Sequence, residues 1–428
     1  MLQEKTEFKE TAVGFIPEEW KLVKIDDIKS KKRSSIAMGP FGSNITKDNF
    51  IESGVPVIRG GNFSDFKFAE KDFVYLSEEK ADELKSSNVF PKDIILTHRG
   101  TLGQVGIIPE NSKYPRYVVS QSQMKLTCDE NKINPFYLFY FLKSKMGQHL
   151  FLMNASQTGV PAIARPTSSL KEIMVPLPTL SEQKSIVDVL KSITDKIEIN
   201  QKMNQTLEEI GQAIFKQWFV HFEFPNEEGK PYKSSGGEMV DSELGEIPNG
   251  WEVVKIAELI ELVYGKGLTK NKRKSGEIPV YGSNGITDYH NESFVRGPGL
   301  IIGRKGTVGK IHISYDDFWP IDTTYFVKSK IDSIIFFWYY LLNSLNLEKM
   351  NVHSAVPGLN RNDIYYLLVL KPKFNVLLDV EIQLKSLFDK INQNNLENEN
   401  LSQIRDSLLP KLMSGKIRVN GDKNEIFS

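Results

Sequence analysis

Residues 14 to 28 read GFIPEEWKLVKIDDI, and residues 245 to 259 read GEIPNGWEVVKIAEL. Both stretches place an Ile-Pro pair shortly before a tryptophan and a Val-Lys-Ile run shortly after it. The 231 residues between the two starts far exceed the roughly 20 to 50 residues of a solenoid repeat. The duplication therefore predicts two whole domains in tandem within one chain.

The duplication extends along most of the chain. Four further blocks occur twice in the same order, while the offset between copies shrinks from 231 to about 194 residues, as loops of unequal length would produce. The first block is an apolar strand entering a glycine-rich turn, and the third is aromatic throughout, which predicts a short buried helix. The blocks are IESGVPVIRGGN (51 to 62) with KSGEIPVYGSN (274 to 284), HRGTLGQVGII (98 to 108) with RKGTVGKIHI (304 to 313), FYLFYFLKS (136 to 144) with FFWYYLLNS (336 to 344), and VPAIAR (160 to 165) with VPGLNR (356 to 361).

Each copy is followed by a long helix with a heptad pattern. The first begins after Pro176 and Pro178, with Ser181 as the expected N-cap. Apolar residues and one asparagine recur every seven residues in both helices, which is the pattern of a coiled-coil seam. The expected helix-pairing residues are Ile193, Asn200, Leu207 and Ile214 in the first helix and Leu387, Asn394, Leu401 and Leu408 in the second.

The asparagine falls at the same heptad step in both helices, and two interpretations stay open. In the first, Asn200 and Asn394 are tolerated, partly hydrated residues at the seam. In the second, the helices pack antiparallel and the two asparagines meet, so that a slipped register buries an unpaired amide at a cost of about 1 to 3 kcal/mol. Antiparallel packing predicts a pseudo-twofold molecule with one globular copy at each end of the helix pair.

The overall composition is that of a soluble globular protein, with 40% hydrophobic and 25% charged residues. Cys128 is the only cysteine, which excludes a disulfide framework or a cysteine-based zinc site within the chain. The N-terminus lacks the apolar core of a signal peptide, and the most apolar run, 334 to 342, is shorter than the roughly 20 residues of a membrane span. We expect a cytoplasmic protein with no membrane partner.

Charge is unevenly distributed, although the formal net charge is zero. Between Tyr264 and Lys310 there are nine basic residues and three acidic ones, and the last helix has the opposite bias. Basic clusters in the globular copies predict contacts to nucleic-acid phosphates, which weaken steeply with salt. The first copy has a weaker basic cluster at Lys29, Lys31, Lys32, Arg33, Lys47 and Arg59.

The loops of both copies carry side chains suited to reading DNA. Arg and Lys offer donors that match guanine, Asn and Gln match adenine, and a neighbouring glycine lets the backbone approach closely. A solvated loop charge is the commoner role for any one such residue, but their enrichment as a group favours DNA contact. The candidate DNA-binding residues are Lys47, Arg59, Asn62, His98, Arg99, Thr101, Gln121 and Gln123 in the first copy and Lys266, Lys270, Lys272, Arg273, Asn284, Arg304, Lys305 and Thr307 in the second.

Taken together, these segments resemble the specificity subunit of type I restriction-modification enzymes. The likeness covers nearly the whole chain and rests on the order and duplication of its segments. The second copy departs from the first at the start of its helix, VLKPKFNVLLDVEIQ (369 to 383), and at GKGLTKNKRKSG (265 to 276). The matching segments are IPEEW (16 to 20), IPNGW (247 to 251), GPFGSN (39 to 44), SQTGVPAIAR (156 to 165), PLPTLSEQKSIVDVLKSI (176 to 193), WFVHFEF (218 to 224), DSELGEIPNGWEVVK (241 to 255) and LLPKLMSGKIRV (408 to 419).

The resemblance implies an α+β chain in which two target-recognition domains each read one half of a bipartite, asymmetric site in double-stranded DNA. Two long helices would form the spacer and dock two modification (M) subunits, which bind S-adenosylmethionine and methylate adenine, and restriction (R) subunits would join to cut DNA. The chain itself would be non-catalytic and hold no cofactor and no metal. The expected boundaries are an N-terminal tail at 1 to 15, the first recognition domain at 16 to 177, a central spacer helix at 178 to 222, a connector at 223 to 247, the second recognition domain at 248 to 374, a C-terminal spacer helix at 375 to 415 and a tail at 416 to 428.

Enzyme and scaffold alternatives rest on weaker motifs. The nearest match to an amino-methyltransferase motif, NPFY at 134 to 137, lacks the second proline, and no G-x-x-x-x-G-K-[ST] phosphate loop is present. Glu-x-Lys triplets such as Glu228 to Lys230 match part of a metal-dependent nuclease pattern. The GTLG and GTVG turns fit either an RNA-binding G-x-x-G loop or an ordinary hairpin.

Overall fold

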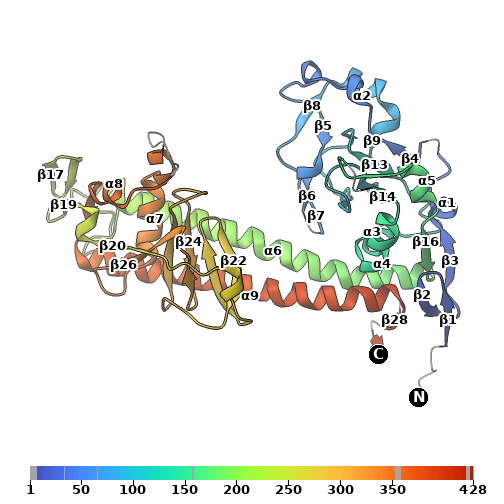
Figure 1. Cartoon of the computed structure of the whole chain (residues 1–428). Helices are drawn as coiled ribbons and strands as arrows, with labels where there is room; N and C mark the ends of the chain where they lie inside the picture. Colours follow the sequence, from blue (N-terminus) through green and yellow to red (C-terminus); the bar gives the residue numbers. More distant parts are fainter. Residues whose placement is uncertain are drawn as a thin grey trace. The chain divides into compact units, whose positions relative to one another are not determined.

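The chain divides into two compact units. Unit 1 contains residues 1–198 and 398–428, and unit 2 contains residues 199–397. Each unit holds one copy of the repeat and one portion of each long helix, α6 (Leu180–Phe219) and α9 (Phe374–Met413) (Figure 1). The computed structural model describes residues 7–32, 34–64, 66–156, 159–351, 358–420 and 425–427, so that Arg33 of the expected basic cluster lies outside the described residues.

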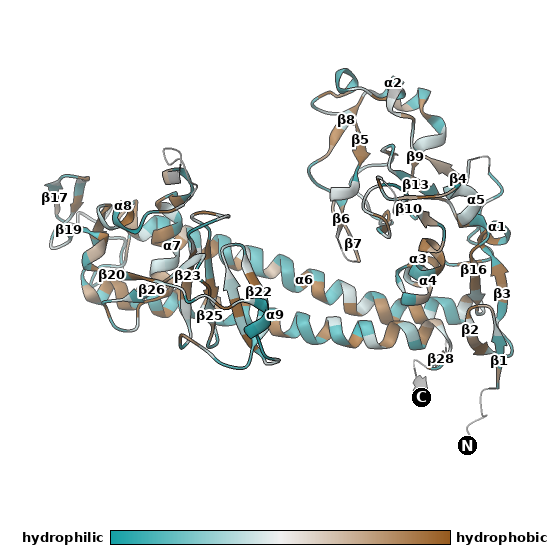
Figure 2. Ribbon diagram, viewed as in Figure 1, coloured by the Kyte–Doolittle hydropathy of each residue, from teal (hydrophilic) through white to brown (hydrophobic). Residues whose placement is uncertain are grey.

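Unit 1 is built on two four-stranded sheets. The first has the strand order β11-β10-β13-β4, with all neighbours antiparallel. The second has the order β8-β5-β12-β9, in which β5 and β12 run parallel. The strands are rich in β-branched residues that favour pleated, buried positions, and β5 and β8 have the hydrophobic colour in Figure 2. They are β4 (Ile36–Met38), β5 (Val55–Ile58), β8 (Val74–Leu76), β9 (Asn88–Val89), β10 (Ile94–Thr97), β11 (Val105–Ile107), β12 (Tyr117–Val119) and β13 (Gln123–Leu126).

Unit 2 repeats this plan with different residues. Its antiparallel sheet has the order β24-β23-β26-β20, and its second sheet has the order β22-β21-β25, in which β21 and β25 run parallel. The expected strand that enters a glycine-rich turn is confirmed in both copies, as β5 and β21. The strands are β20 (Ile260–Tyr264), β21 (Ile278–Gly282), β22 (Gly285–His290), β23 (Gly299–Gly303), β24 (Ile311–Ser314), β25 (Trp319–Pro320) and β26 (Thr324–Ser329).

Two short ladders close each copy. The strand after the repeated tryptophan pairs with the strand before the long helix, so that both ends of a copy lie together. A hairpin precedes that tryptophan in each unit. The ladders are β1 (Phe8–Thr11) with β2 (Gly14–Pro17) and β3 (Lys21–Lys24) with β16 (Met174–Leu177) in unit 1, and β17 (Met239–Ser242) with β18 (Gly245–Pro248) and β19 (Glu252–Lys255) with β27 (Leu368–Lys371) in unit 2.

The aromatic block forms a buried helix in each unit, as predicted. The first N–H groups of any helix lack partners within it, and here a side chain from the adjoining long helix supplies one. Gln183 Oε1 accepts from Asn134 N (2.7 Å) just before α3, while the Glu381 carboxylate accepts from three backbone N–H groups at the start of α7, including Phe336 N (2.9 Å). The helices are α1 (Ile25–Ile28), α2 (Glu78–Glu83), α3 (Pro135–Lys143), α4 (Lys145–Leu152), α5 (Pro166–Lys171), α7 (Phe336–Ser344) and α8 (Arg361–Tyr365).

The repeated tryptophan is buried in both units by different neighbours. Trp20 Nε1 donates to Glu182 Oε2 (3.1 Å), and the Arg418 guanidinium, which pairs with both oxygens of that carboxylate, lies 5.7 Å from the Trp20 ring centroid. Trp251 instead packs among three phenylalanine rings, with centroid distances of 5.2 to 5.8 Å. The segment after α9, which includes β28 (Arg418–Asn420), therefore meets the N-terminal segment within unit 1. The three rings belong to Phe219, Phe222 and Phe224.

Helix α6 begins earlier than the sequence indicates. Thr179 Oγ1 accepts from Glu182 N (3.3 Å), so Thr179, directly after Pro178, occupies the cap position. Ser181, the expected N-cap, lies in the first turn, and that prediction was wrong. The proline before Thr179 favours an extended backbone, which is the conformation that a capping residue needs.

Polar contacts join α6 and α9 within unit 2. Asn200 Nδ2 donates to Glu397 Oε2, and Asn394 Nδ2 donates to Asn204 Oδ1, each at 2.8 Å. Both seam asparagines are buried. The contact differs from the expected meeting of Asn200 with Asn394, because the amide of each reaches a polar residue about one turn along the opposite helix. The apolar seam residues Ile193, Leu207, Ile214, Leu387, Leu401 and Leu408 are all partly buried.

Candidate nucleic-acid interface

Two equivalent hairpin loops carry six of the candidates: His98, Arg99 and Thr101 in unit 1, and Arg304, Lys305 and Thr307 in unit 2. The loop between β10 and β11 in unit 1 contains Gly100 and Gly103, whose φ angles are +84° and +86°. The loop between β23 and β24 in unit 2 contains Gly306 and Gly309, at +80° and +79°. These left-handed angles favour glycine because other residues have a Cβ that clashes there. Both loops join antiparallel strands, which confirms the hairpin interpretation.

The two loops are held by the same pair of backbone hydrogen bonds. In unit 1, His98 N donates to Ser122 O and Ile163 N donates to His98 O, both at 2.9 Å. In unit 2, Arg304 N donates to Thr323 O and Leu359 N donates to Arg304 O, also at 2.9 Å. His98 and Arg304 therefore occupy equivalent positions in the two units.

A second point of close packing is also shared. A Cβ built on Gly39 would lie 1.9 Å from Ser120 O, and one built on Gly265 would lie 2.1 Å from Ile321 O. Both glycines directly follow the outer strand of the antiparallel sheet, β4 or β20. No side chain fits at such a distance, so the backbone frame beneath the loops is the same in both units.

The side chains on this frame differ in charge. His98 is buried, and burial lowers the pKa of its imidazole, so the neutral form is favoured. Arg304 carries a permanent charge; its Nη2 donates to Asp322 O (2.8 Å), and its Cζ lies 5.2 Å from the Tyr264 ring centroid. The equivalent positions thus hold a neutral group in unit 1 and a cation in unit 2.

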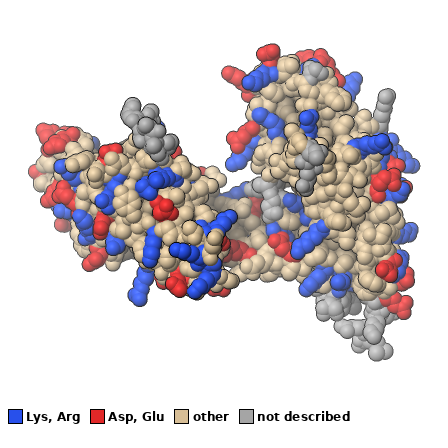
Figure 3. Space-filling model, viewed as in Figure 1, with Lys and Arg blue, Asp and Glu red and all other residues tan. Residues whose placement is uncertain are grey.

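The candidates of unit 2 lie mostly on its surface, and Figure 3 shows Lys and Arg clustered on the visible face of this unit. Lys266 Nζ lies 5.6 Å from the ring centroids of both Phe294 and Trp319. Arg273 and Arg304 are half-buried, and the Arg273 guanidinium pairs with Asp288 (3.0 Å) and donates to Leu268 O. The exposed candidates are Lys266, Lys270, Lys272, Asn284, Lys305 and Thr307.

The candidates of unit 1 divide into exposed and buried groups. Asn62 is buried and uses its whole amide within its own loop, accepting from Arg59 N and donating to Ala69 O and Lys71 O. Gln123 is buried and bonded to Ser120. We therefore assign these two side chains to holding loops in shape, in place of the expected base contact. The exposed candidates are Lys47, Arg59, Arg99, Thr101 and Gln121.

The structure also brings together residues that loop composition missed. Arg361 Cζ lies 5.1 Å from the Tyr264 ring centroid, next to Arg304. A signal was present in the sequence, because arginine closes both VPAIAR and VPGLNR. The sequence marks these two blocks only as a structural repeat, and neither contains a glycine next to an arginine. Their arginines were therefore not among the candidate DNA-binding residues.

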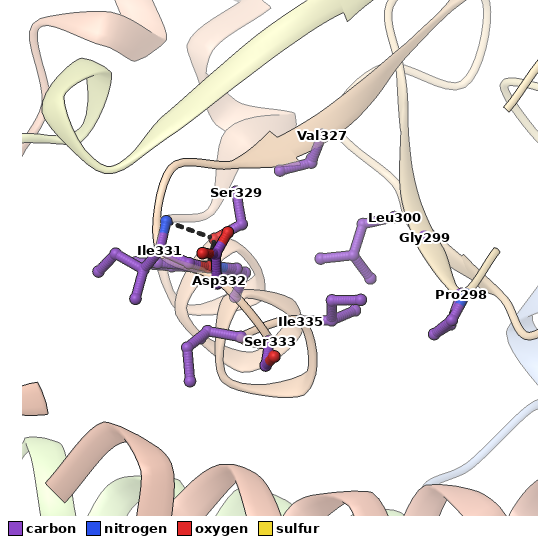
Figure 4. Close-up of a pocket in the computed structure, with 11 residues that line it drawn as sticks. Pro298, Gly299, Leu300, Val327, Ser329, Ile331, Asp332, Ser333 and Ile335 are labelled. Carbon is purple, nitrogen blue, oxygen red and sulfur yellow. Dashed lines mark hydrogen bonds between the residues drawn. The ribbon is translucent and has the colours of Figure 1, made fainter. Parts of the chain in front are cut away.

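A pocket of about 200 Å³ in unit 2 contains none of the candidates. Most of its lining residues are of apolar types, and they include Leu300, Val327 and Ile335 (Figure 4). Ile331 N donates to Ser329 Oγ (3.1 Å) at its edge. Asp332 is its only charged residue, so it offers no cationic donors to DNA.

The longest helices in the described parts of the chain, α6 and α9, each have 40 residues. None of the described helices is long and apolar enough to cross a membrane. No three His, Cys, Asp or Glu side chains among the described residues lie together as possible metal ligands.

Comparison with known proteins matches both halves of the chain to one family. The family model described as Type I restriction modification DNA specificity domain matches residues 17–209 and 248–404. The MjaIX specificity subunit of Methanocaldococcus jannaschii is 27% identical over 448 residues, covering 97% of both chains. The HindI specificity subunit of Haemophilus influenzae is 24% identical over 400 residues, covering 73% of this chain and 85% of that protein.

A solved structure has the same fold. The crystal structure of the S subunit of a type I restriction-modification system from M. genitalium superposes with a TM-score of 0.57. The match has 18% sequence identity and covers 96% of this chain and 98% of the other. At this identity the likeness concerns the fold alone, a chain of mixed helices and sheets.

Proposed function

Because the chain belongs to the type I restriction modification DNA specificity family, it is a specificity subunit with a bipartite DNA target, and we propose that each unit reads one half. The family is a non-catalytic, DNA-recognising component of its system. We infer that the chain recognises the DNA sequence within a complex whose other subunits carry out catalysis.

One observation carries this proposal: the two units share a backbone frame and differ in the side chains that the frame presents. His98 and Arg304 have the same backbone partners, yet one is neutral and the other is cationic. Arg304 offers a charged donor to an anion, whereas the buried, neutral His98 offers none at the same position. The two halves of the site are therefore expected to be unlike, which makes the target asymmetric.

The proposed DNA-contacting set contains the exposed candidates and the half-buried Arg304, and it omits His98, which is buried. In unit 1, Lys47, Arg59 and Arg99 supply phosphate contacts, while Thr101 and Gln121 supply hydrogen bonds to base edges. In unit 2, Lys266, Lys270, Lys272 and Lys305 supply the charge, with Asn284 and Thr307 beside them. Asn62, Gln123 and Arg273 are left out because their polar atoms are engaged within the protein.

We propose that α6 and α9 form an antiparallel coiled coil that sets the spacing between pseudo-twofold related domains. The contacts within unit 2 support this arrangement: as the α6 residue changes from Asn200 to Asn204, its α9 partner changes from Glu397 to Asn394. The heptad pattern continues on both sides of these contacts. In this proposal the recognition domains are residues 16 to 177 and 248 to 374, with 223 to 247 as their connector.

The exposed faces of the long helices are the proposed docking surface for two modification subunits. Apolar side chains are exposed at i and i+4 spacing on both helices, with Ile382 the most exposed at 61%. Covering such residues with a partner removes apolar surface from water. Restriction subunits join the same complex, which we place in the cytoplasm. The exposed large apolar residues are Leu180, Ile199, Met203 and Ile210 on α6, and Phe374, Leu378, Ile382, Leu396 and Ile404 on α9.

The alternatives have less support. None of the family matches supports a nuclease. Glu228 of the Glu-x-Lys triplet is exposed and pairs with its own neighbour Lys230 (2.8 Å). The GTLG and GTVG turns are ordinary hairpin loops between antiparallel strands. They therefore give no specific support to RNA binding.

Mapping of methylated adenines tests the proposal. DNA from cells that carry this chain with its modification subunit is expected to be methylated at one sequence made of two unlike halves around an unspecified spacer. The control is DNA from cells with the modification subunit alone. Methylation at a continuous or palindromic sequence, or methylation that does not require this chain, would contradict the proposal.

A further inference from the structure

We propose that Arg304, Arg361 and Tyr264 form a site in unit 2 that binds the phosphate backbone of DNA. We call this cluster the two-arginine site. It extends the proposed function, on which it rests, by assigning a ligand chemistry to specific residues. Arg361 and Tyr264 are new to the interface, and Arg304, expected from the sequence to read DNA, is assigned to phosphate.

The site joins three segments that are far apart in the sequence. Tyr264 ends β20, Arg304 follows β23, and Arg361 begins α8. The two guanidinium carbons lie 5.2 and 5.1 Å from the Tyr264 ring centroid, within the range of a cation–π contact. Tyr264 is 47% exposed, so a ligand can reach the cluster from solvent.

Each guanidinium is fixed before DNA arrives. Arg304 Nη2 donates to Asp322 O (2.8 Å), and Arg361 Nη1 donates to Leu262 O (3.3 Å). The backbone link from Leu359 N to Arg304 O ties the two arginine segments together. Donors that are already oriented lose little side-chain freedom on binding, which favours a charge-assisted contact.

The charge of this site is not balanced by any described residue. Both arginines are half-buried, and within the described parts of the chain neither has a carboxylate at ion-pair distance, while the Nε–H of each is buried without a partner. Two neighbouring cations beside low-dielectric protein repel each other, and an anion relieves that repulsion. Four other partly or fully buried arginines, Arg116, Arg273, Arg405 and Arg418, each pair with a carboxylate.

A phosphate fits these donors better than a base edge does. Reading guanine requires an arginine that extends its fork into the groove. Here both guanidinium groups are held against Tyr264 and against backbone carbonyls, so neither is free to extend into a groove. Fixed cations at the surface position the duplex and carry no sequence information.

The described residues of unit 1 form no such site. His98 takes the position of Arg304 and is neutral, because burial lowers the pKa of its imidazole. Met38, which precedes Gly39, takes the position of Tyr264, which precedes Gly265. The two-arginine site therefore anchors only the half of the DNA that unit 2 reads.

The test couples the protein change to a DNA change. The complex of the full chain with its modification subunit is titrated with a duplex that carries the methylated site, in which phosphates of the unit 2 half are replaced one at a time by uncharged methylphosphonates. We expect the unmodified complex to lose about tenfold in affinity at one or two adjacent phosphates. Arg361→Ala is expected to bind the normal duplex about tenfold more weakly and to lose nothing further at those phosphates.

Salt dependence gives a second readout. Loss of one phosphate contact makes the slope of log affinity against log salt less negative by about 0.9. Lys371→Ala is the matched control, since it removes an exposed unit 2 charge that pairs with Glu252 and should leave both readouts unchanged. Arg361→Lys keeps the charge but not the fork, and is expected to fall between the parent and Arg361→Ala.

Three outcomes would overturn the assignment. Unchanged affinity and salt slope in Arg361→Ala would make the cluster purely structural. A change of the methylated sequence at one position, with the phosphate losses retained, would make it a base-reading site. If Arg361→Ala fails to assemble, the same measurements are made on Arg361→Lys and Tyr264→Leu, and normal phosphate losses in both would count against the site. If the unmodified complex does not prefer its own site over a scrambled duplex, the proposed function itself fails.

Discussion

The loops at 98–103 and 304–309 share a backbone but differ in charge at their first position, which is His98 in one and Arg304 in the other. Matching glycines turn both loops, and matching backbone bonds hold both, but one presents a buried neutral histidine and the other an arginine beside a second arginine. Glycines and inward-pointing side chains set the position of each loop backbone. The outward-pointing side chains are left to contact DNA. A chain built this way can change one half of its target without changing its frame.

The two tryptophan sites teach the same lesson about the core. Trp20 is held by a carboxylate and an arginine, whereas Trp251 is held by three phenylalanines. Both solutions bury the indole at the same place in the repeat. The same fold therefore accommodates the repeated tryptophan with either ionic or aromatic neighbours. Substitution of these neighbours should affect the stability of the two units differently.

The largest expected effect tests whether the frames are truly equivalent. Gly39→Ala and Gly265→Ala each place a Cβ against a backbone oxygen, at 1.9 and 2.1 Å, and should each lower the free energy of unfolding by at least about 3 kcal/mol. Urea unfolding measures both. Gly61→Ala, where nothing lies within 4 Å, is the control. A large loss at one position and none at the other would show that the frames differ.

The next effect should be confined to unit 1. Arg418→Ala leaves the mostly buried Glu182 carboxylate without its bidentate partner, which should cost about 2 to 3 kcal/mol. Hydrogen exchange should then quicken in β1–β3 and stay unchanged in β17–β19. Breaking the exposed Lys371–Glu252 pair should cost under about 1 kcal/mol. Equal loosening of both tryptophan sites would contradict the account.

The helix seam should respond alike from either helix. Asn200→Ala and Asn394→Ala each remove a buried amide that donates across the pair, and we expect each to lower the unfolding free energy by about 1 to 2 kcal/mol. Thermal unfolding measures the loss, with the exposed Gln205→Ala as the control. Unfolding energies unchanged by both substitutions would mean that the asparagines are merely tolerated.

The smallest expected effect concerns pH and separates the two loops. Burial lowers the pKa of folded His98 below the unfolded value of about 6.5. Above that pH the imidazole is neutral in both states; below it the unfolded chain binds a proton that the folded chain resists, so stability falls as pH falls. His98→Asn should reduce this loss of stability between about pH 7 and pH 5 by less than about 1 kcal/mol. An identical pH dependence in the variant would argue against a neutral His98.

Much of the frame could be predicted from the sequence because duplication and periodicity carry it. The aromatic helices fall where their blocks lie, at Pro135–Lys143 and Phe336–Ser344, and the long helix expected at 178 to 222 is observed at Leu180–Phe219. The cap at Thr179 was missed because serine and threonine are both good caps, and the choice depends on where the chain turns after Pro178.

The site was harder to predict because composition does not tell which polar atoms are already used. Asn62 and Arg273 are residue types that often read DNA. In the structure, however, Asn62 is hydrogen-bonded within unit 1 and Arg273 pairs with a carboxylate within unit 2. Arg361 could not be found from its own loop, because it joins Arg304 only through Tyr264 on a third segment. The partners of Asn200 and Asn394 also lie about one turn from the positions expected from the sequence. A heptad pattern fixes which face of a helix is buried but does not fix the axial register between two helices.

Exchange of residues 16 to 177 for the same segment of a relative, followed by mapping of methylated adenines, tests the modular account most directly. The account predicts a new sequence in one half of the methylated site, with the other half and the spacer length unchanged. A change in both halves, or in neither, would contradict it.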